Sequence, residues 1–326
     1  MRTGAAAGHL GCFHEAAFYG SDEDFLSIVV PFLEDGLEAG EPTLVAFDET
    51  NEKLIRGAMG GAAGLSFLSG AVQYARPAGA IKKYRTMMAA HVAGGAEQIR
   101  IVGDVPHPGL GASWDRWARY EATVNHAFDD FPLWGLCPYD TRITPDDVLA
   151  DVARTHPHIA SADGEHRPNA GFEDPIGFLG HLGAAEPDPL ELAPPSAELW
   201  SFTPSAARDA VIRGAADTGV SPSDVDDLVI AVSEAVANAD RYGVAPIRLR
   251  LWAGSDRLVV TVTDQGRGPA DPFAGLVPAR NSTGGLGLWI VHQLCARVTM
   301  STGEDGFTLR MVVGRPGLTQ RGVVSA

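Results

Sequence analysis

The chain has 326 residues, 45% of them hydrophobic, and a mean hydropathy close to zero, which is typical of a globular protein with enough chain for two cores. Its formal net charge is −16, and its lysines are only Lys53, Lys82 and Lys83, which argues against binding to nucleic acid or anionic membranes. No apolar run approaches the roughly 20 residues that span a bilayer, and no signal peptide is evident, so we expect a cytoplasmic protein.

The first half alternates helical and strand-like segments. An apolar helical period over residues 22–39 is followed by strand-like runs at 43–47, 98–102 and 133–136. Short apolar strands separated by helices predict a three-layer fold with a mostly parallel sheet, and the carboxyl ends of its strands would line a ligand crevice. Those ends carry Asp48, Asp104, Cys137, Tyr139 and Asp140.

This half resembles the MEDS sensory domain, a module related in fold to RecA-type ATPases. The resemblance rests on His14, Tyr19, IRIVGD (99–104), WARYEATVN (117–125), LCPYD (136–140) and THPHI (155–159). Asp104 departs from the Glu expected there. The GxxxxGK[ST] phosphate loop does not occur in the sequence, so the resemblance implies a domain that senses an unidentified small molecule and does not hydrolyse nucleotide.

Several residues of this half could in principle bind a metal, namely His14, His107, Cys137, His156 and His158. They are scattered along the chain without close ligand-pair spacing, so we do not predict a metal site here. The cysteines are also widely separated, which predicts buried thiols and no disulfide framework.

Residues 161–195 are rich in Pro, Gly, Ala and acidic residues, with one apolar cluster at 176–182. This composition predicts a linker with at most one short helix. The predicted organisation is therefore a sensory domain at 8–160, a linker at 161–195, a second domain at 196–316 and a tail at 317–326.

The second domain is predicted to begin with a strand at 198–202 and a helix opening at Thr203. Ser221 and Pro222 start the next helix, which carries SEAVANADRY (233–242). Strands at 247–252 and 258–263, a lid segment at 269–283, a helix at 286–297 and strands at 298–301 and 307–313 follow. These elements predict a two-layer α/β sandwich in which helices cover one face of a mixed sheet.

Three groups of residues in this domain suit a nucleotide pocket. Glu234 and Asn238 are four residues apart, so they share one helix face, although a solvated face is the alternative interpretation. Asn238 can complete a Mg²⁺ shell, and Glu234 can accept a proton from an attacking hydroxyl. Asp264 can accept a hydrogen bond from the amino group of adenine. Gly266 and Gly268 would let the backbone approach the nucleotide closely. Gly285, Leu286 and Gly287 lie at the start of a helix, where free N–H groups favour phosphate.

Two arginines are further candidates for phosphate contact. A guanidinium matches phosphate oxygens, so Arg241 and Arg280 could each meet a nucleotide, with exposure to solvent as the alternative.

In this order the three groups resemble the N, G1 and G2 boxes of the histidine-kinase/gyrase ATPase fold, and in particular those of RsbW-type anti-sigma factor kinases. The resemblance covers about 196–316 and, with the MEDS-like half, extends to RsbA-type regulatory proteins. It implies ATP and Mg²⁺ as cofactors and a serine/threonine kinase that phosphorylates an anti-sigma factor antagonist. It also implies a sigma factor as second partner, while the oligomeric state, a homodimer included, stays open.

Two departures keep a second hypothesis open. Asp240 and Tyr242 stand where an RsbW-type N box often has an apolar residue and His, which favours a nucleotide-dependent anti-sigma-like binding switch without kinase activity. A histidine kinase is a third hypothesis. It is disfavoured because residues 161–195 are too short for a dimerisation hairpin and the phosphoacceptor His of that family is missing.

Overall fold

The computed structural model of the chain describes residues 2–60, 63–182, 186–278 and 285–314. Two compact units make up the chain, Met1–His181 and Leu182–Ala326. Among the helices in the described ranges, none combines the length and the apolar character that crossing a bilayer requires.

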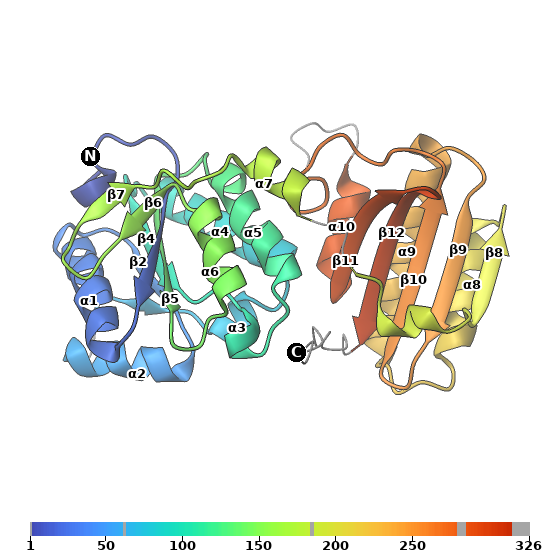
Figure 1. Ribbon diagram of the computed structural model, residues 1–326, viewed down its shortest axis with the longest axis horizontal. Coiled ribbons are helices and arrows are strands. Elements are labelled where there is room, and N and C mark those ends of the chain that lie inside the picture. Colours follow the sequence, from blue (N-terminus) through green and yellow to red (C-terminus); the bar gives the residue numbers. More distant parts are fainter. Residues whose placement is uncertain (1, 61–62, 183–185, 279–284, 315–326) are drawn as a thin grey trace, which may run out of the picture. The chain divides into compact units, whose positions relative to one another are not determined.

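The first unit is built on a seven-stranded sheet with strand order β3-β2-β4-β5-β1-β6-β7 (Figure 1). Every neighbouring pair is parallel except β6 and β7, which confirms the predicted mostly parallel sheet. The strands are β1 (Phe13–Tyr19), β2 (Thr43–Ala46), β3 (Ser66–Phe67), β4 (Ile99–Gly103), β5 (Leu133–Asp140), β6 (His158–Ala160) and β7 (His166–Pro168).

Helices cover both faces of this sheet, which gives the predicted three layers (Figure 1). Ser21 caps α1 by accepting a hydrogen bond from the Asp24 N–H at 3.1 Å, and α1 buries Phe25, Val29 and Leu33 against one face. The helices are α1 (Asp22–Glu38), α2 (Glu49–Ala58), α3 (Gly70–Gln73), α4 (Pro77–Ala93), α5 (Asp115–Ala127), α6 (Asp146–Thr155) and α7 (Pro175–His181), with 3₁₀ turns η1 (Gly4–Ala6) and η2 (Pro108–Leu110).

A buried ion pair links the middle of the sheet to the turn before β2. Arg100 in β4 is fully buried, and its Nε donates to Glu41 Oε2 at 2.7 Å. The other guanidinium nitrogens donate to Phe32 O at 2.8 Å and Thr3 Oγ1 at 2.9 Å, and the guanidinium carbon lies 4.4 Å from the centroid of the Trp134 ring. The charge is therefore both paired and hydrogen-bonded, as burial of an ion requires.

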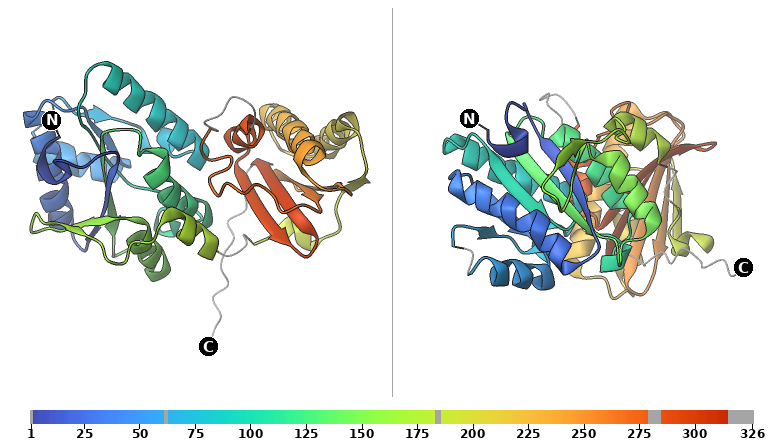
Figure 2. Two further views of the ribbon diagram at one scale, coloured as in Figure 1. Left: turned by 90° about the horizontal axis from the view of Figure 1, so that it is seen from above. Right: turned by 60° about the vertical axis from the view of Figure 1, so that its left-hand side comes forward.

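The second unit is a two-layer sandwich with sheet order β11-β12-β10-β9-β8. Figure 2 shows its helices together on one side of the sheet. All four strand pairings are antiparallel, so the predicted mixed sheet is wrong. The elements are β8 (Ala197–Trp200), α8 (Pro204–Ala215), α9 (Pro222–Tyr242), β9 (Arg248–Ala253), β10 (Arg257–Asp264), α10 (Leu286–Leu294), β11 (Arg297–Gly303) and β12 (Gly306–Gly314).

The stretch predicted as a linker is more ordered than expected. Its first part forms β7 and α7 within the first unit, and its last part forms the 3₁₀ turn η3 (Pro189–Leu192) within the second. Asp188 pairs with Arg257 at 3.0 Å and Glu191 pairs with Arg310 at 3.0 Å, on the sheet face where Leu190 packs. Its acidic residues thus anchor this segment to strand arginines, whereas the composition alone predicted a linker.

Candidate functional site

Helix α9 positions the first group of predicted site residues. Its apolar stripe, including Leu228, Val232 and Val236, is buried in the core of the second unit. Glu234 and Asn238 are half-buried, so they do not lie on a fully exposed face of the helix. A Cβ atom built on Gly287, in the first turn of α10, would lie 2.8 Å from Glu234 Oε2 and 2.9 Å from Asn238 Nδ2. The two helices therefore meet closely where both side chains point, and a larger residue at position 287 would displace one or both of these side chains.

Asp264 ends β10 and is 5% exposed. Its Oδ1 accepts hydrogen bonds from the Gly266 N–H at 2.7 Å and the Val244 N–H at 3.1 Å. Within the described residues these bonds engage Oδ1, so Oδ2 is the oxygen that can meet a ligand. Gly268 follows with φ of 73°, and a Cβ there would lie 2.3 Å from the Phe307 ring. Both the backbone conformation and the ring therefore require glycine at this position.

A cavity of about 400 Å³ lies between helix and sheet in this unit and is lined by four predicted residues, Asn238, Asp264, Gly268 and Gly285. Its volume is within the range typical of small-molecule pockets, about 300–1,000 Å³. Gly285 caps α10 with φ of 92°. The amide nitrogen of Asn238 is buried and has no hydrogen-bond partner among the described residues.

The other predicted residues lie at or beyond the margin of this cavity. Glu234 and Gly287 lie beside Asn238, and Gly266 lies beside Asp264. Leu286 is exposed in the first turn of α10. Arg241 is not among the residues that line the cavity, and its guanidinium carbon lies 5.9 Å from the centroid of the Tyr242 ring. Arg280 falls outside the described residues.

Sequence reasoning missed several residues of the cavity wall. Arg267 lines the cavity between the two glycines that were predicted, and Tyr242 lines it at the end of α9. Phe307 also lines it, because antiparallel pairing places this residue opposite Asp264. The position of Arg267 between Gly266 and Gly268 was the available signal, whereas Phe307 depends on a strand register that sequence motifs do not reveal.

The predicted crevice of the first unit is also present, in part. A pocket of about 150 Å³ is lined by Asp48, Asp104 and Asp140, together with Arg142 and Asn51. Asn51 Nδ2 donates to Asp104 Oδ2 at 3.1 Å, and Asp140 pairs with Arg142 at 2.7 Å. Cys137 and Tyr139 were expected in the same crevice, but they are not among its lining residues, because alternate side chains of β5 point to opposite faces of the sheet.

Asp104 predicts a pH dependence of stability. Burial raises the pKa of Asp104 to about 8, and the charges of Asp48 and Asp140 add to the rise. An unfolded Asp titrates near about 3.9, so stability falls as pH rises from there through the folded pKa. We expect Asp104→Asn to remove this loss, so that its Tm exceeds that of the wild type by several degrees more at about pH 8 than at about pH 5.

The control for this experiment is Glu34→Gln, at an exposed position of α1. Its Tm difference from the wild type should not change with pH. Thermal unfolding across the pH series measures both, and a constant Tm difference for Asp104→Asn would contradict the prediction.

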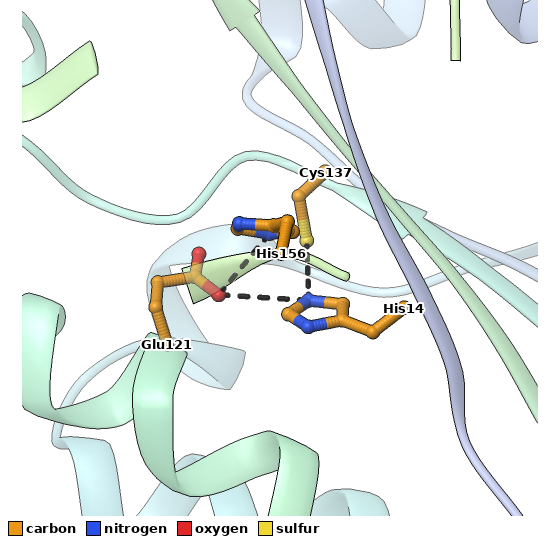
Figure 3. A group of neighbouring side chains, drawn as sticks. All are labelled: His14, Glu121, Cys137 and His156. Atoms are coloured by element: carbon orange, nitrogen blue, oxygen red, sulfur yellow. Dashed lines mark hydrogen bonds and ion pairs between the residues drawn. The ribbon is translucent and has the colours of Figure 1, made fainter. Parts of the chain in front are cut away.

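On the other face of β5, residues far apart in sequence converge. His14, Cys137 and His156 lie together with Glu121 of α5, a residue that the sequence did not single out (Figure 3). Three of the five candidates therefore converge in space despite their separation along the chain, whereas His107 and His158 are not part of this cluster. Burial lowers the pKa of His14 to about 4 and raises the pKa of Glu121 to about 7, so the cluster is costly to charge without a counter-ion.

Comparisons with known proteins agree with the two units. The model of the MEDS domain (methanogen/methylotroph, DcmR sensory domain) matches residues 13–157, and that of the histidine kinase-like ATPase domain matches residues 203–313. The serine-protein kinase RsbW of Staphylococcus epidermidis is 32% identical over 111 residues, which cover 29% of this chain and 68% of that kinase.

Two solved structures are similar at lower identity. The RsbU and RsbW domains of a Mycobacterium tuberculosis protein match with 23% identity and a TM-score of 0.27, covering 38% of this chain and 34% of that one. The histidine kinase domain of the E. coli osmosensor EnvZ matches with 21% identity and a TM-score of 0.23, covering 41% and 98%.

The family models and the kinase relative thus account for both units in the order in which they occur. Through its second unit the chain belongs to the RsbW family of histidine kinase-like ATPases, and with its N-terminal MEDS domain it has the architecture of an RsbA-type regulator.

Proposed function

We propose that the second unit is a Mg²⁺- and ATP-dependent serine/threonine kinase of the partner-switching type. Its substrate would be an anti-sigma factor antagonist, and its alternative partner a sigma factor. The observation that carries the proposal is the convergence of Asn238, Asp264 and Gly285 on one cavity, with Glu234 beside it. A domain of this size can suffice for a kinase, because phosphoryl transfer depends mainly on the positioning of the reactants and on charge stabilisation.

The residues at the cavity fit Mg-ATP, which when bound would supply the phosphoryl group. Asn238 lines the cavity, and a carboxamide oxygen is a suitable Mg²⁺ ligand. Asp264 keeps Oδ2 for the amino group of adenine, while Oδ1 is held by two backbone N–H groups. The N–H groups at the start of α10 favour phosphate. Glu234 would take the proton that the acceptor hydroxyl loses.

The test is to incubate the full chain with Mg-ATP and a candidate antagonist. Acid-stable phosphate on the antagonist supports the proposal. Acid-labile phosphate on the chain itself would indicate a histidine kinase instead, and nucleotide binding without transfer would indicate a binding switch.

The binding switch is the second candidate, and one observation favours it. Tyr242 lines the cavity at a position where an RsbW-type N box often has His, and Asp240 adds an exposed carboxylate two residues earlier. An extra negative charge near a Mg²⁺ site would alter the geometry of the phosphates. In the binding-switch hypothesis, the bound nucleotide determines which partner protein the second unit binds. The first unit shifts this preference when it binds the small molecule that it senses.

Asp264→Asn predicts a loss of nucleotide affinity. Asn retains an oxygen for the Val244 and Gly266 N–H groups, so the turn is preserved, but the charged acceptor for adenine is removed. A hydrogen bond to a charged group contributes about 1.5–3 kcal/mol, so ADP affinity should fall roughly ten- to hundredfold. Isothermal titration calorimetry measures the change.

Asp226→Asn is the matched control, because Asp226 is an exposed carboxylate of α9 and is not among the residues that line the cavity. This variant should bind ADP as the wild type does. Wild-type affinity in Asp264→Asn would remove Asp264 from the nucleotide site.

A further inference from the structure

The first unit contains a buried cluster of four side chains whose chemistry the kinase proposal does not use. His14 comes from β1, Glu121 from α5, Cys137 from β5, and His156 directly follows α6 (Figure 3). One nitrogen, oxygen or sulfur atom of each lies within 4.8 Å of the others. His14 Nε2 lies 3.4 Å from Cys137 Sγ and 3.6 Å from Glu121 Oε2, and His156 Nε2 lies 3.6 Å from the same oxygen.

The surrounding hydrogen bonds fix the tautomer of both histidines. Asn125 Nδ2 donates to Thr155 O at 2.8 Å, so its Oδ1 is the atom that faces His14 Nδ1 at 3.1 Å, and Nδ1 must donate. His156 Nδ1 lies 2.8 Å from Val152 O, a carbonyl that can only accept, so this Nδ1 also carries its proton. Each histidine therefore turns the lone pair of its Nε2 into the cluster, which is the arrangement found around metal-bound imidazoles.

Glu121 is held in the same way. Its Oε1 accepts a hydrogen bond from the Tyr139 hydroxyl at 2.6 Å, which leaves Oε2 facing the two Nε2 atoms. Glu121 and His156 are fully buried, yet Glu121 Oε2 and His156 Nε2 have no hydrogen-bond partner among the described residues. Atoms that bear lone pairs are thus gathered at one buried point, where each unsatisfied group costs free energy.

We propose that His14, Glu121, Cys137 and His156 bind one divalent transition-metal ion of the Zn²⁺ class. Nitrogen, sulfur and carboxylate ligands together suit Zn²⁺, and a thiolate with a carboxylate would balance its charge in the buried site. Zn–N and Zn–O bonds of about 2.0–2.1 Å and a Zn–S bond of about 2.3 Å give tetrahedral edges of about 3.3–3.6 Å. Three of the six separations, 3.4, 3.6 and 3.6 Å, lie within about 0.3 Å of these edges, and all six lie within 4.8 Å.

A small internal cavity borders the same cluster. It has a volume of about 40 Å³ and is lined by His14, Glu121 and Cys137 together with the aromatic residues Tyr84 and Tyr120. This volume admits a water-sized molecule. An ion in the cluster would therefore be reachable by a ligand of that size, which gives the first unit a means of responding to either the metal or a small molecule bound to it.

Titration of the full chain with Co²⁺ tests the proposal directly. The tag-free protein is stripped with a chelator, reduced and desalted, and Co²⁺ serves as a spectroscopic substitute for Zn²⁺. We expect one equivalent to bind, with visible bands of tetrahedral Co²⁺ and a near-ultraviolet band from sulfur coordination, and Zn²⁺ to displace it. Absence of binding to the folded wild-type chain would overturn the proposal.

Variants identify the ligands. Loss of a residue that only hydrogen-bonds to a metal ligand weakens metal binding about 10- to 100-fold, and loss of a direct ligand should cost more. Cys137→Ser and His156→Gln should therefore each weaken Zn²⁺ binding by more than about 100-fold. Cys137→Ser should also lose the sulfur band of bound Co²⁺. Unchanged binding in both variants would overturn the site.

The double variant Cys12→Ser/Cys295→Ser tests the role of Cys137 without changing any proposed ligand, so its result holds even if the ligand variants misfold. It leaves Cys137 as the only thiol of the chain. It should keep the sulfur band, and loss of that band from the folded double variant would exclude Cys137 as a ligand. Glu234→Gln, in the other unit, should leave the titration unchanged, so this test and the kinase test fail independently.

Discussion

Replacement of Glu234 by Gln is expected to lower phosphoryl transfer by about 10²- to 10⁴-fold while nucleotide binding is retained, because a general base contributes about that factor. Gln has the same shape as Glu, which matters where a Cβ on Gly287 would approach Oε2 to 2.8 Å. The substitution therefore removes the proton acceptor and keeps the packing. The rate of acid-stable phosphate transfer to the antagonist and the affinity for ADP, measured separately, test both parts.

Two further variants of α9 complete this experiment. Asn238→Ala should lose Mg²⁺-dependent nucleotide binding, because it removes the proposed metal ligand from the cavity wall. Asp226→Asn lies at an exposed position of the same helix and should change neither binding nor transfer. If Glu234→Gln transferred phosphate at the full rate, its role as the base would be rejected.

Replacement of Glu41 by Ala is expected to lower the free energy of unfolding of the first unit by about 3–5 kcal/mol, the usual effect of leaving one member of a buried ion pair without its partner. Arg100 would keep its bonds to Phe32 O and Thr3 Oγ1 but lose its counter-charge at 2.7 Å. Hydrogen exchange of peptides from β4, followed as a function of urea, reports the stability of this unit within the full chain.

The surface pair of α2 supplies the comparison. Glu52 lies 2.8 Å from Arg56, with both side chains partly exposed, so Glu52→Ala should cost at most about 0.5 kcal/mol. The double variant Glu41→Ala/Arg100→Met should recover much of the lost stability, because no buried charge remains. A loss in Glu41→Ala no larger than that in Glu52→Ala would show that the Arg100 charge is not effectively buried.

Elements with a strong local signal were predicted well. Helix α9 begins after Ser221, whose Oγ accepts the Asp224 N–H at 3.1 Å, as the Ser-Pro start predicts. The predicted starts of β4 and β10, at residues 98 and 258, differ by one residue from the observed starts at Ile99 and Arg257. Strand direction was predicted wrongly for the second sheet, because pairing depends on contacts between segments that are distant along the chain.

The candidate site was predicted in part. Asn238, Asp264, Gly268 and Gly285 line one cavity, as the order of the three boxes indicated, but their catalytic and binding roles stay predictions. Arg241 carries no local motif that distinguishes a phosphate ligand from a surface residue, and the fold places it beside Tyr242 outside the cavity wall.

The sequence by itself determined the order of the elements of the second unit, the starts of α1, α8, α9 and α10 and the residue types of the three boxes, because helix caps, side-chain periods and glycine requirements act over a few residues. Only the tertiary structure decided that Glu121 joins His14, Cys137 and His156, and that Asp188 and Glu191 anchor the segment before β8. Strand order and helix packing set these contacts between segments distant along the chain, and local sequence patterns carry no record of that packing.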